Sequence, residues 1–128
     1  MVDAADLLPA DVEAKLAGRL AEVEQRSRHQ FVVVTVKSLG GRQIEDYGRT
    51  LGNHWGIGRK GADDGVLLVV APVERKVRIE VGKGLEKALT DEEAAAIVQD
   101  DILPRFIAGQ MSEGITAGSD TIIREITA

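Results

Sequence analysis

The stretch Val66-Leu67-Leu68-Val69-Val70-Ala71 is the longest apolar run in the chain, and it decides the fold. Unbroken runs of this kind are typical of strands that are buried on both faces of a sheet. The run Phe31 to Val36 has the same character and predicts a second buried strand. From Lys76 to Val81, apolar and charged residues alternate instead, which predicts a strand with one exposed face. We therefore expect a small sheet built from strands 31–36, 66–71 and 76–81.

Segments with apolar residues at helical spacing fill most of the remaining chain. We expect helices from Pro9 to Arg26–His29, over 44–55, from the capping box Thr90-Asp91-Glu92-Glu93 towards Pro104, and over 112–126. Proline lacks a backbone N–H and clashes with the preceding helical turn, so Pro104 should kink or end the third of these helices.

The order of the elements predicts the topology. A helix separates strands 31–36 and 66–71, so these two strands should be parallel, with a right-handed crossover. Only a short connection separates 66–71 from 76–81, so the second pair should be antiparallel. With helices on both faces, the expected architecture is an α/β fold: one domain over residues 1–128, forming a three-layer α/β/α sandwich around a small mixed sheet.

The composition is that of an ordinary globular domain, and it narrows the range of partners. Apolar residues make up 44% of the 128 residues and charged residues 29%, and the formal net charge is −5. An acidic chain is a poor general nucleic-acid binder and suits a divalent cation or a basic partner better. The absence of cysteine excludes disulfides, thiolate metal sites and a cysteine nucleophile. No apolar run reaches the length of a membrane span.

Acidic residues occur in segments that the topology brings to one end of the sheet. The start of strand 66–71 and the end of strand 76–81 share that end because the two strands are antiparallel. The acids expected there are Asp63, Asp64, Glu86 and Asp91. Converging carboxylates and carbonyl oxygens are the ligands that Ca²⁺ or Mg²⁺ needs. The opposite end, with Gly40-Gly41 and the hairpin 72–75, offers little acid.

Each of these acids also has a simpler interpretation. Asp63 and Asp64 favour a turn before a strand, and Glu86 suits a solvated surface. Asp91 lies in the first turn of a helix, where the helix dipole favours acids. Asp100 lies near the expected end of the third helix, where the dipole disfavours acids, and this misfit makes it a further candidate for the site. The alternative for Asp100 is a solvated helix face.

The remaining unusual residues give no sign of covalent catalysis. The sequence has no G-x-S-x-G elbow and no P-loop, so an enzyme built on it would depend on metal-activated water. His29 and His54 each lack a second histidine at ligand spacing, and we expect both on the surface. Gly118 and Ser119 should allow close helix packing. Trp55 should lie in the core or at its edge.

Several blocks of the sequence, in their order, resemble the TPM domain family. The blocks are Val34-Thr35-Val36-Lys37-Ser38-Leu39-Gly40-Gly41, Ile44-Glu45-Asp46-Tyr47, Trp55-Gly56-Ile57-Gly58, Asp64-Gly65-Val66-Leu67-Leu68-Val69-Val70, Arg78-Ile79-Glu80-Val81-Gly82-Lys83-Gly84-Leu85-Glu86 and Leu89-Thr90-Asp91. The resemblance runs from Asp3 to the last helix. It implies the same α/β/α sandwich, and a domain that usually stands outside the cytoplasm, often after a signal peptide and before a membrane helix.

Calcium binding and acid phosphatase activity are attributed to some members of this family, and plant and cyanobacterial members work at thylakoid membranes in photosystem II repair. The resemblance implies Asp63, Asp64 and Glu86 as ligands of Ca²⁺ or Mg²⁺, with Asp91 and Asp100 as further candidates. We therefore expect a monomeric, cation-binding, extracytoplasmic module that serves a membrane protein complex. The alternative is a metal-dependent acid phosphatase that acts on phosphomonoesters, with a phosphorylated substrate as its partner.

Overall fold

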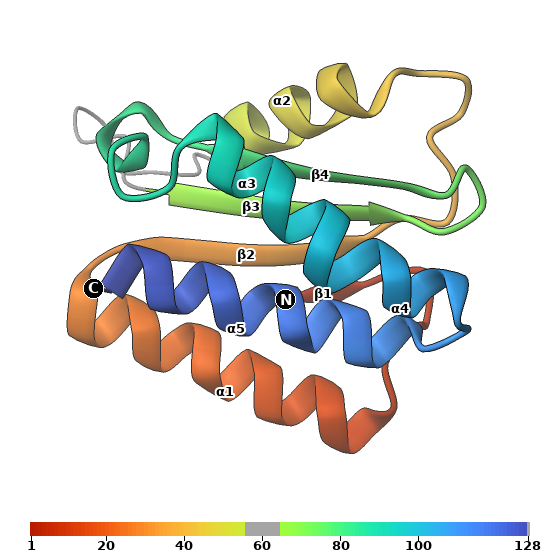
Figure 1. Cartoon of the computed structure of the whole chain (residues 1–128), viewed down its shortest axis with the longest axis horizontal. Helices are drawn as coiled ribbons and strands as arrows, with labels where there is room; N and C mark the ends of the chain where they lie inside the picture. Colours follow the sequence, from red (N-terminus) through yellow and green to blue (C-terminus); the bar gives the residue numbers. More distant parts are fainter. Residues whose placement is uncertain (56–64, 128) are drawn as a thin grey trace.

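A mixed four-stranded sheet forms the centre of the fold (Figure 1). The structure, a computed structural model, describes residues 1–55 and 65–127, and for residues 54 and 55 it describes the backbone only. The strands lie in the order β1 (Val2–Asp3), β2 (Gln30–Thr35), β3 (Gly65–Ala71) and β4 (Lys76–Val81). β1, β2 and β3 run parallel, and β4 is antiparallel to β3. The predicted mixed sheet and its strand directions are confirmed.

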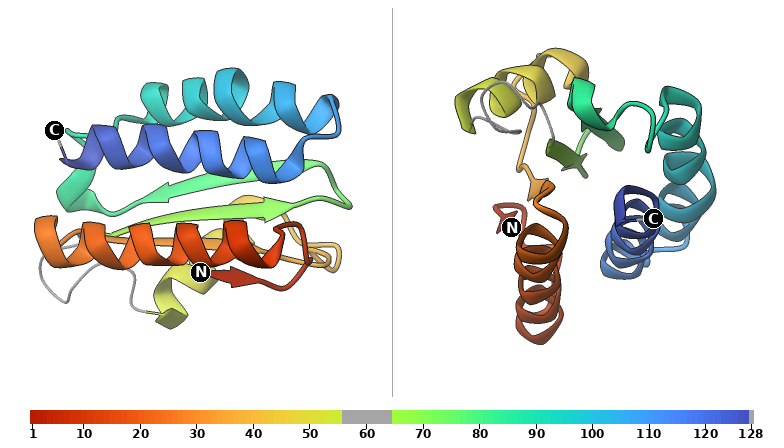
Figure 2. Two further views of the ribbon diagram at one scale, coloured as in Figure 1. Left: turned by 90° about the horizontal axis from the view of Figure 1, so that it is seen from below. Right: turned by 90° about the vertical axis from the view of Figure 1, so that its left-hand side faces the viewer.

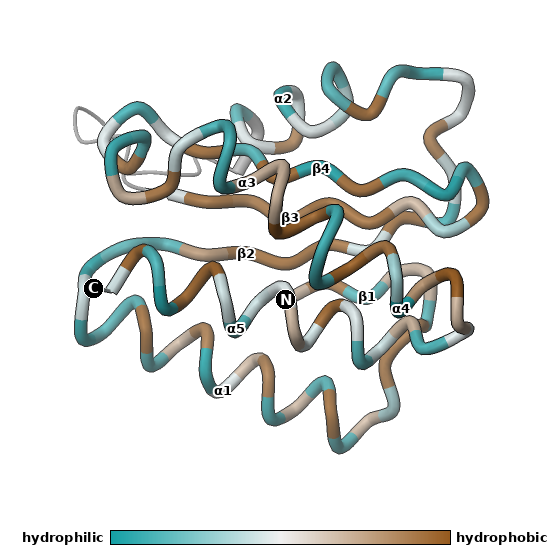
Figure 3. The backbone as a smooth tube through the Cα atoms, in the orientation of Figure 1, coloured by the Kyte–Doolittle hydropathy of each residue, from teal (hydrophilic) through white to brown (hydrophobic). Residues whose placement is uncertain are grey.

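β3 is the buried centre of the sheet because both of its faces are covered. Every residue of β3 is buried, and the strand is apolar along most of its length (Figure 3). Side chains alternate between the two faces of a strand, so β3 contributes to two separate cores. Val66, Leu68 and Val70 belong to the larger core, and Leu67, Val69 and Ala71 to the smaller one.

Helices cover both faces of the sheet, which confirms the predicted three-layer arrangement (Figure 2). The helices are α1 (Ala10–Ser27), α2 (Ile44–Trp55), α3 (Asp91–Ile97), α4 (Leu103–Ile107) and α5 (Met111–Thr127), with a 3-10 turn at Lys83–Leu85 and a π-helical segment at Val98–Ile102. α2 packs on the smaller core through Ile44, Tyr47 and Leu51. α1, α3 and α5 pack on the larger core. None of the helices in the described part of the chain is long and apolar enough to cross a membrane.

The third helix ends before Pro104, as the sequence predicts, but the chain stays helical beyond it. α3 passes into the π-helical segment, where the N–H of Leu103 donates to the carbonyl oxygen of Val98. α4 begins directly afterwards, and Pro104 lies in its first turn, where a missing N–H costs little. Asp100 therefore lies within a continuous helical stretch and not at a helix C-terminus. The dipole misfit that made Asp100 unusual does not arise.

α5 approaches the π-helical segment closely because it carries glycine at the points of contact. A Cβ atom at Gly118 would lie 2.5 Å from Cδ1 of Ile102, and one at Gly114 would lie 2.8 Å from the ring of Phe106. Ile102 is fully buried and cannot move aside without disturbing the larger core. Ser119, next to Gly118, is also fully buried. The prediction that this pair allows close helix packing is confirmed.

β1 is held to the sheet by the carboxylate of Asp3. Its Oδ1 accepts from the N–H of Leu7 at 2.9 Å and from the hydroxyl of Thr35 at 2.6 Å. Its Oδ2 accepts from the N–H of Leu8 at 2.8 Å. The buried Thr35 oxygen in turn accepts from the N–H of Ala5 at 3.0 Å. The sequence does not predict this strand, because two residues are too few to show a periodicity.

Candidate cation site at one end of the sheet

One end of the sheet, on the left of Figure 1, brings together the start of β3, the end of β4 and the start of α3. The N–H of Gly82 donates to the carbonyl oxygen of Gly65 at 2.8 Å, which extends the pairing of β3 and β4 past the last residue of β4. Gln30 of β2 pairs with Gly65 from the other side. We call the end formed by Gly65, Gly82–Glu86 and Thr90–Asp91 the acidic end. Its assembly agrees with the topology inferred from the sequence.

Glu86 is carried by a turn that two leucines fix to the core. The N–H of Leu85 donates to the carbonyl oxygen of Gly82 at 2.9 Å, which closes the 3-10 turn. The N–H of Leu89 then donates to the carbonyl oxygen of Leu85 at 2.8 Å, and both leucine side chains are buried. Between these two anchors, the side chain of Glu86 is exposed. The turn therefore presents a carboxylate to solvent from a fixed backbone.

Asp91 opens α3, and a capping box fixes its position. The N–H of Glu93 donates to Oγ1 of Thr90 at 3.1 Å, and the N–H of Thr90 donates to Oε1 of Glu93 at 3.2 Å. These reciprocal bonds confirm the capping box predicted from the sequence. The hydrogen bond from the Thr90 N–H lowers the pKa of the Glu93 carboxyl, because it stabilises the anion. Asp91 itself is exposed at the first position of the helix.

Asp100 belongs to a different group of acids. It lies in the π-helical segment, roughly 13 Å along the helical chain from Asp91. There it lines a shallow hollow between the π-helical segment and α5, together with Asp101, Thr121 and Glu125. The structure therefore places Asp100 away from the acidic end.

Asp63 and Asp64 lie outside the described residues. Within residues 1–55 and 65–127, no group of three histidine, aspartate or glutamate side chains could hold a metal ion. The described candidates at the acidic end are therefore Glu86 and Asp91. Gly65, the residue that follows Asp64 in the chain, is bonded to the turn that carries Glu86.

His29, which was predicted to lie on the surface, is half-buried at this end of the sheet. It precedes β2, whose first residue pairs with Gly65. Its side chain is half-buried, and Nδ1 is shielded from solvent with no hydrogen-bond partner among the described residues. The parallel pairing of β2 and β3 is the signal that could have found it, because it brings the residue before β2 to the end where β3 starts.

The opposite end of the sheet also carries acids, contrary to the sequence analysis. We call it the hairpin end, and it is formed by Asp3, the segment 37–41 and the hairpin 72–75. Oε2 of Glu74 accepts from the N–H of Leu39 at 2.9 Å and from the hydroxyl of Ser38 at 3.1 Å. The Leu39 N–H lowers the pKa of the Glu74 carboxyl, although desolvation acts in the other direction. Burial tends to raise the pKa of Asp3, but its hydrogen bonds outweigh burial, and the net shift is downward.

A family model described as the TPM domain matches residues 1–125 of the chain. The chain belongs to the TPM family. The solution structure of the N-terminal domain of a protein from P. gingivalis is similar to this TPM domain, with 34% sequence identity and a TM-score of 0.91. That match covers 98% of this chain and 80% of the other.

Two further solved structures share the fold of this TPM domain at low sequence identity. The BA42 protein from the psychrophilic bacterium Bizionia argentinensis has 16% identity and a TM-score of 0.78, with 94% of this chain and 82% of the other covered. The N-terminal domain of the cg2496 protein from Corynebacterium glutamicum has 16% identity and a TM-score of 0.73, with 96% and 76% covered. The comparison with curated proteins finds no match.

Proposed function

We propose that this TPM domain is a divalent-cation-binding module that acts outside the cytoplasm and serves membrane protein complexes. In this proposal Ca²⁺ or Mg²⁺ binds at the acidic end, and the ligands are carboxylate and backbone oxygens. Asp63, Asp64 and Glu86 supply the carboxylates, and Asp91 is a further donor beside them. Asp100 stands apart from this set because it lies between the π-helical segment and α5.

The observation that carries the proposal is the hydrogen bond between the Gly82 N–H and the Gly65 carbonyl oxygen. It holds the turn that bears Glu86 beside the residue that follows Asp64 in the chain. The carboxylates of Glu86 and Asp91 make no hydrogen bond or ion pair with any other described residue. Their oxygens are therefore free for a cation.

The charge of the chain and its similar proteins support the rest of the proposal. A net charge of −5 attracts cations to an exposed acidic end. Two of the similar solved structures are N-terminal domains of longer proteins, which is typical of a module. A position outside the cytoplasm and a role beside membrane protein complexes rest on the family resemblance.

The proposal is tested by titrating ¹⁵N-labelled protein with Ca²⁺ and then with Mg²⁺ while backbone amide shifts are recorded. We expect the largest shifts at Gly65 and Gly82–Glu86. Asp64→Asn and Glu86→Gln should each weaken binding about tenfold or more, because each removes a charged ligand. Asp11→Asn is a matched control, since Asp11 is an exposed acid in the first turn of α1, and α1 begins on the side of the molecule away from the acidic end (Figure 1). It should bind the cation as the unmodified chain does. Shifts that centre on Asp100 and Glu125, or no saturable shift at all, would contradict the proposed site.

The same samples distinguish the module from the acid phosphatase. Hydrolysis of a phosphomonoester that requires the cation and disappears in Asp64→Asn would make the acidic end a catalytic site. Cation binding without hydrolysis in any sample supports the module. Fractionation of the native cells tests the proposed location directly, because a cytoplasmic protein would contradict it.

A further inference from the structure

The outer edge of β4 carries backbone groups that the sheet leaves unused. β4 is the last strand in the order, so β3 is its partner on one side only. The N–H of Gly82 bonds to Gly65, and bonded pairs alternate with non-bonded pairs along an antiparallel ladder. Gly82 and Gly65 form a bonded pair, so the next residue of β4, and every second residue after it, directs its N–H and C=O away from β3. These residues are Val77, Ile79 and Val81.

No other residue in the described ranges bonds to these outward groups. Unpaired edges of this kind pair readily with another strand unless something covers them. The other edge of the sheet is different, because the strand there, β1, has only two residues. β4 is therefore the edge on which a further strand could be added over several residues.

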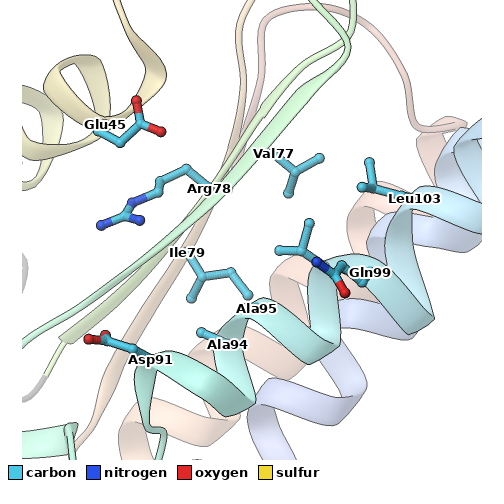
Figure 4. A pocket seen from close by; sticks show the side chains of 10 residues that line it. Glu45, Val77, Arg78, Ile79, Asp91, Ala94, Ala95, Gln99 and Leu103 are labelled. Atoms are coloured by element: carbon cyan, nitrogen blue, oxygen red, sulfur yellow. The ribbon is translucent and has the colours of Figure 1, made fainter.

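A groove with a volume of about 450 Å³ follows the edge of β4 between α2 and α3. Val77 and Ile79 point from the strand towards α3, whereas Arg78 points towards α2 (Figure 4). The α3 wall includes the small side chains of Ala94 and Ala95, which leave space beside the strand. The groove thus has an apolar side and a polar side, with unused backbone groups between them.

The edge of β4 lies between α2 and α3, and this position favours the addition of one extended segment. An added strand lies about 4.8 Å from its neighbour and needs no more width than an extended chain. A second copy of this sheet would bring its own flanking helices with it. Those helices would meet α2 and α3, which stand on both sides of β4 in the end-on view (Figure 2, right). The geometry therefore favours an extended segment over an edge-to-edge dimer.

The charges that line the groove favour a basic occupant. Nε of Arg78 donates to Oε1 of Glu80 at 2.9 Å, so these two charges neutralise each other. Glu45 from α2 and Asp91 from α3 also line the groove, and neither has an ion-pair partner in the described part of the chain. The charge that remains uncompensated is therefore negative, and an extended segment with basic side chains complements it.

We propose that this groove binds an extended basic segment of a partner protein, which joins the sheet as an additional strand beside β4. The outward backbone groups of β4 hold the segment, as in other cases of strand addition. Basic side chains of the segment face α2 and meet Glu45. Small apolar side chains of the segment face α3 and lie against Ala94 and Ala95. This surface is separate from the proposed cation site, although Asp91 borders both.

The first test is amide hydrogen exchange in EDTA with a Lys-Val-Lys-Val-Lys-Val peptide, and with the corresponding Glu-Val peptide as control. The Lys-Val peptide should slow exchange at Val77, Ile79 and Val81. Exchange at Arg78 and Glu80 should stay as it is, because their N–H groups already bond to β3. The Glu-Val peptide should leave all five amides unchanged. No alternating protection with the Lys-Val peptide would overturn the proposal.

N-methylated peptides test strand addition itself. Along an extended peptide, the lysine N–H groups point to one side and the valine N–H groups to the other, so β4 bonds to only one of the two sets. Methylation of the valine nitrogens should abolish binding if the segment is antiparallel to β4. Methylation of the lysine nitrogens should abolish it if the segment is parallel. If both methylated peptides fail to bind, or if both still bind, strand addition would be overturned.

Charge reversal tests the α2 side of the groove. Glu45→Lys should weaken binding of the Lys-Val peptide roughly fivefold and allow the Glu-Val peptide to bind. Asp46→Lys makes the same change of charge at the next position of α2 but does not line the groove, so peptide binding should be unchanged. Glu45→Lys should also keep its response to Ca²⁺ and Mg²⁺, which separates this proposal from the cation site. Sedimentation measures whether the chain forms a dimer. A dimer, together with no binding of the Lys-Val peptide, would overturn the choice of a basic peptide as the partner.

Discussion

Both ends of the sheet carry carboxylates, but those of Asp3 and Glu74 at the hairpin end accept hydrogen bonds, whereas the candidate ligands Glu86 and Asp91 at the acidic end accept none from the described residues. At the hairpin end, Asp3 accepts three hydrogen bonds, and Glu74 accepts two. At the acidic end, Glu86 and Asp91 are exposed and accept none from the residues that the structure describes. Both ends have carboxylates. What differs is the number of N–H and O–H groups that donate hydrogen bonds to those carboxylates.

This difference indicates which acids serve the structure and which are free for binding. A carboxylate that accepts several N–H and O–H donors is already stabilised as an anion by the fold. A carboxylate on a fixed turn without such donors keeps its lone pairs for water or for a cation. Removing an acid should therefore cost stability at the hairpin end and binding at the acidic end.

The largest loss of stability should follow removal of the Asp3 carboxylate. Asp3→Ala leaves two backbone N–H groups and the buried hydroxyl of Thr35 without their acceptor, which should lower the free energy of unfolding by about 2–3 kcal/mol. Urea unfolding measures this change. Glu86→Ala is the matched variant at the acidic end, and it should stay within about 0.5 kcal/mol of the unmodified chain. Equal losses in the two variants would remove the distinction between the ends.

A second, smaller loss is expected from the hydroxyl that Asp3 binds. Thr35→Val keeps the branched shape but removes the oxygen that joins Asp3 to the N–H of Ala5, and it should cost about 1–2 kcal/mol. A double-mutant cycle with Asp3→Ala should show that the two losses are coupled, because both residues belong to one network. Strictly additive losses would mean that the network does not act as a unit.

The sequence was sufficient for the strands that have a strong pattern. The run 66–71 and the run 31–36 are so apolar that burial between two helical layers is the only arrangement that removes them from water. They appear as Gly65–Ala71, which begins one residue earlier than predicted, and Gln30–Thr35, which begins and ends one residue earlier. β1 could not be predicted in this way. Its place depends on pairing with residues far along the chain and on the bond between Asp3 and Thr35.

The sequence predicts which segments meet at the acidic end, but not which of their carboxylates remain without hydrogen bonds. The short hairpin fixes the directions of β3 and β4, so the meeting of their ends follows from topology. Which acids remain free could not be predicted, because the donors come from distant segments, as the Leu39 N–H does for Glu74. Asp63 and Asp64 lie outside the described residues, so their place in the site stays a prediction.

A still smaller loss of stability should follow removal of the capping box, in which Thr90 binds the carboxylate of Glu93 near the acidic end. Thr90→Ala removes the oxygen that accepts from the N–H of Glu93, and it should cost about 1 kcal/mol in urea unfolding. The turn that carries Glu86 is anchored by leucine side chains and not by this cap, so the affinity for Ca²⁺ should stay the same. A large change in affinity would show that the start of α3 and the turn act as one unit.

The smallest effect concerns the pH dependence of stability. The pKa of the Asp3 carboxyl in the folded state lies below its ordinary value of 3.8, and that of Glu74 lies below 4.5. A lowered pKa means that the unfolded chain takes up the proton first as the pH falls. Each contribution is therefore fully present above the ordinary value and is lost as the pH falls through the folded value. Acid should weaken the fold first through Glu74 and Glu93, below pH 4.5, and then through Asp3, below pH 3.8.

Amide variants isolate the two steps, because an amide does not titrate. Urea midpoints measured from neutral to strongly acidic pH should fall less steeply for Glu74→Gln than for the unmodified chain once the pH is below 4.5. Asp3→Asn should show the same flattening only below pH 3.8. A Glu74→Gln curve that runs parallel to that of the unmodified chain would mean that the Leu39 N–H does not hold this carboxylate in solution. Glu74 would then resemble the free acids of the acidic end, and the contrast between the two ends would rest on Asp3 alone.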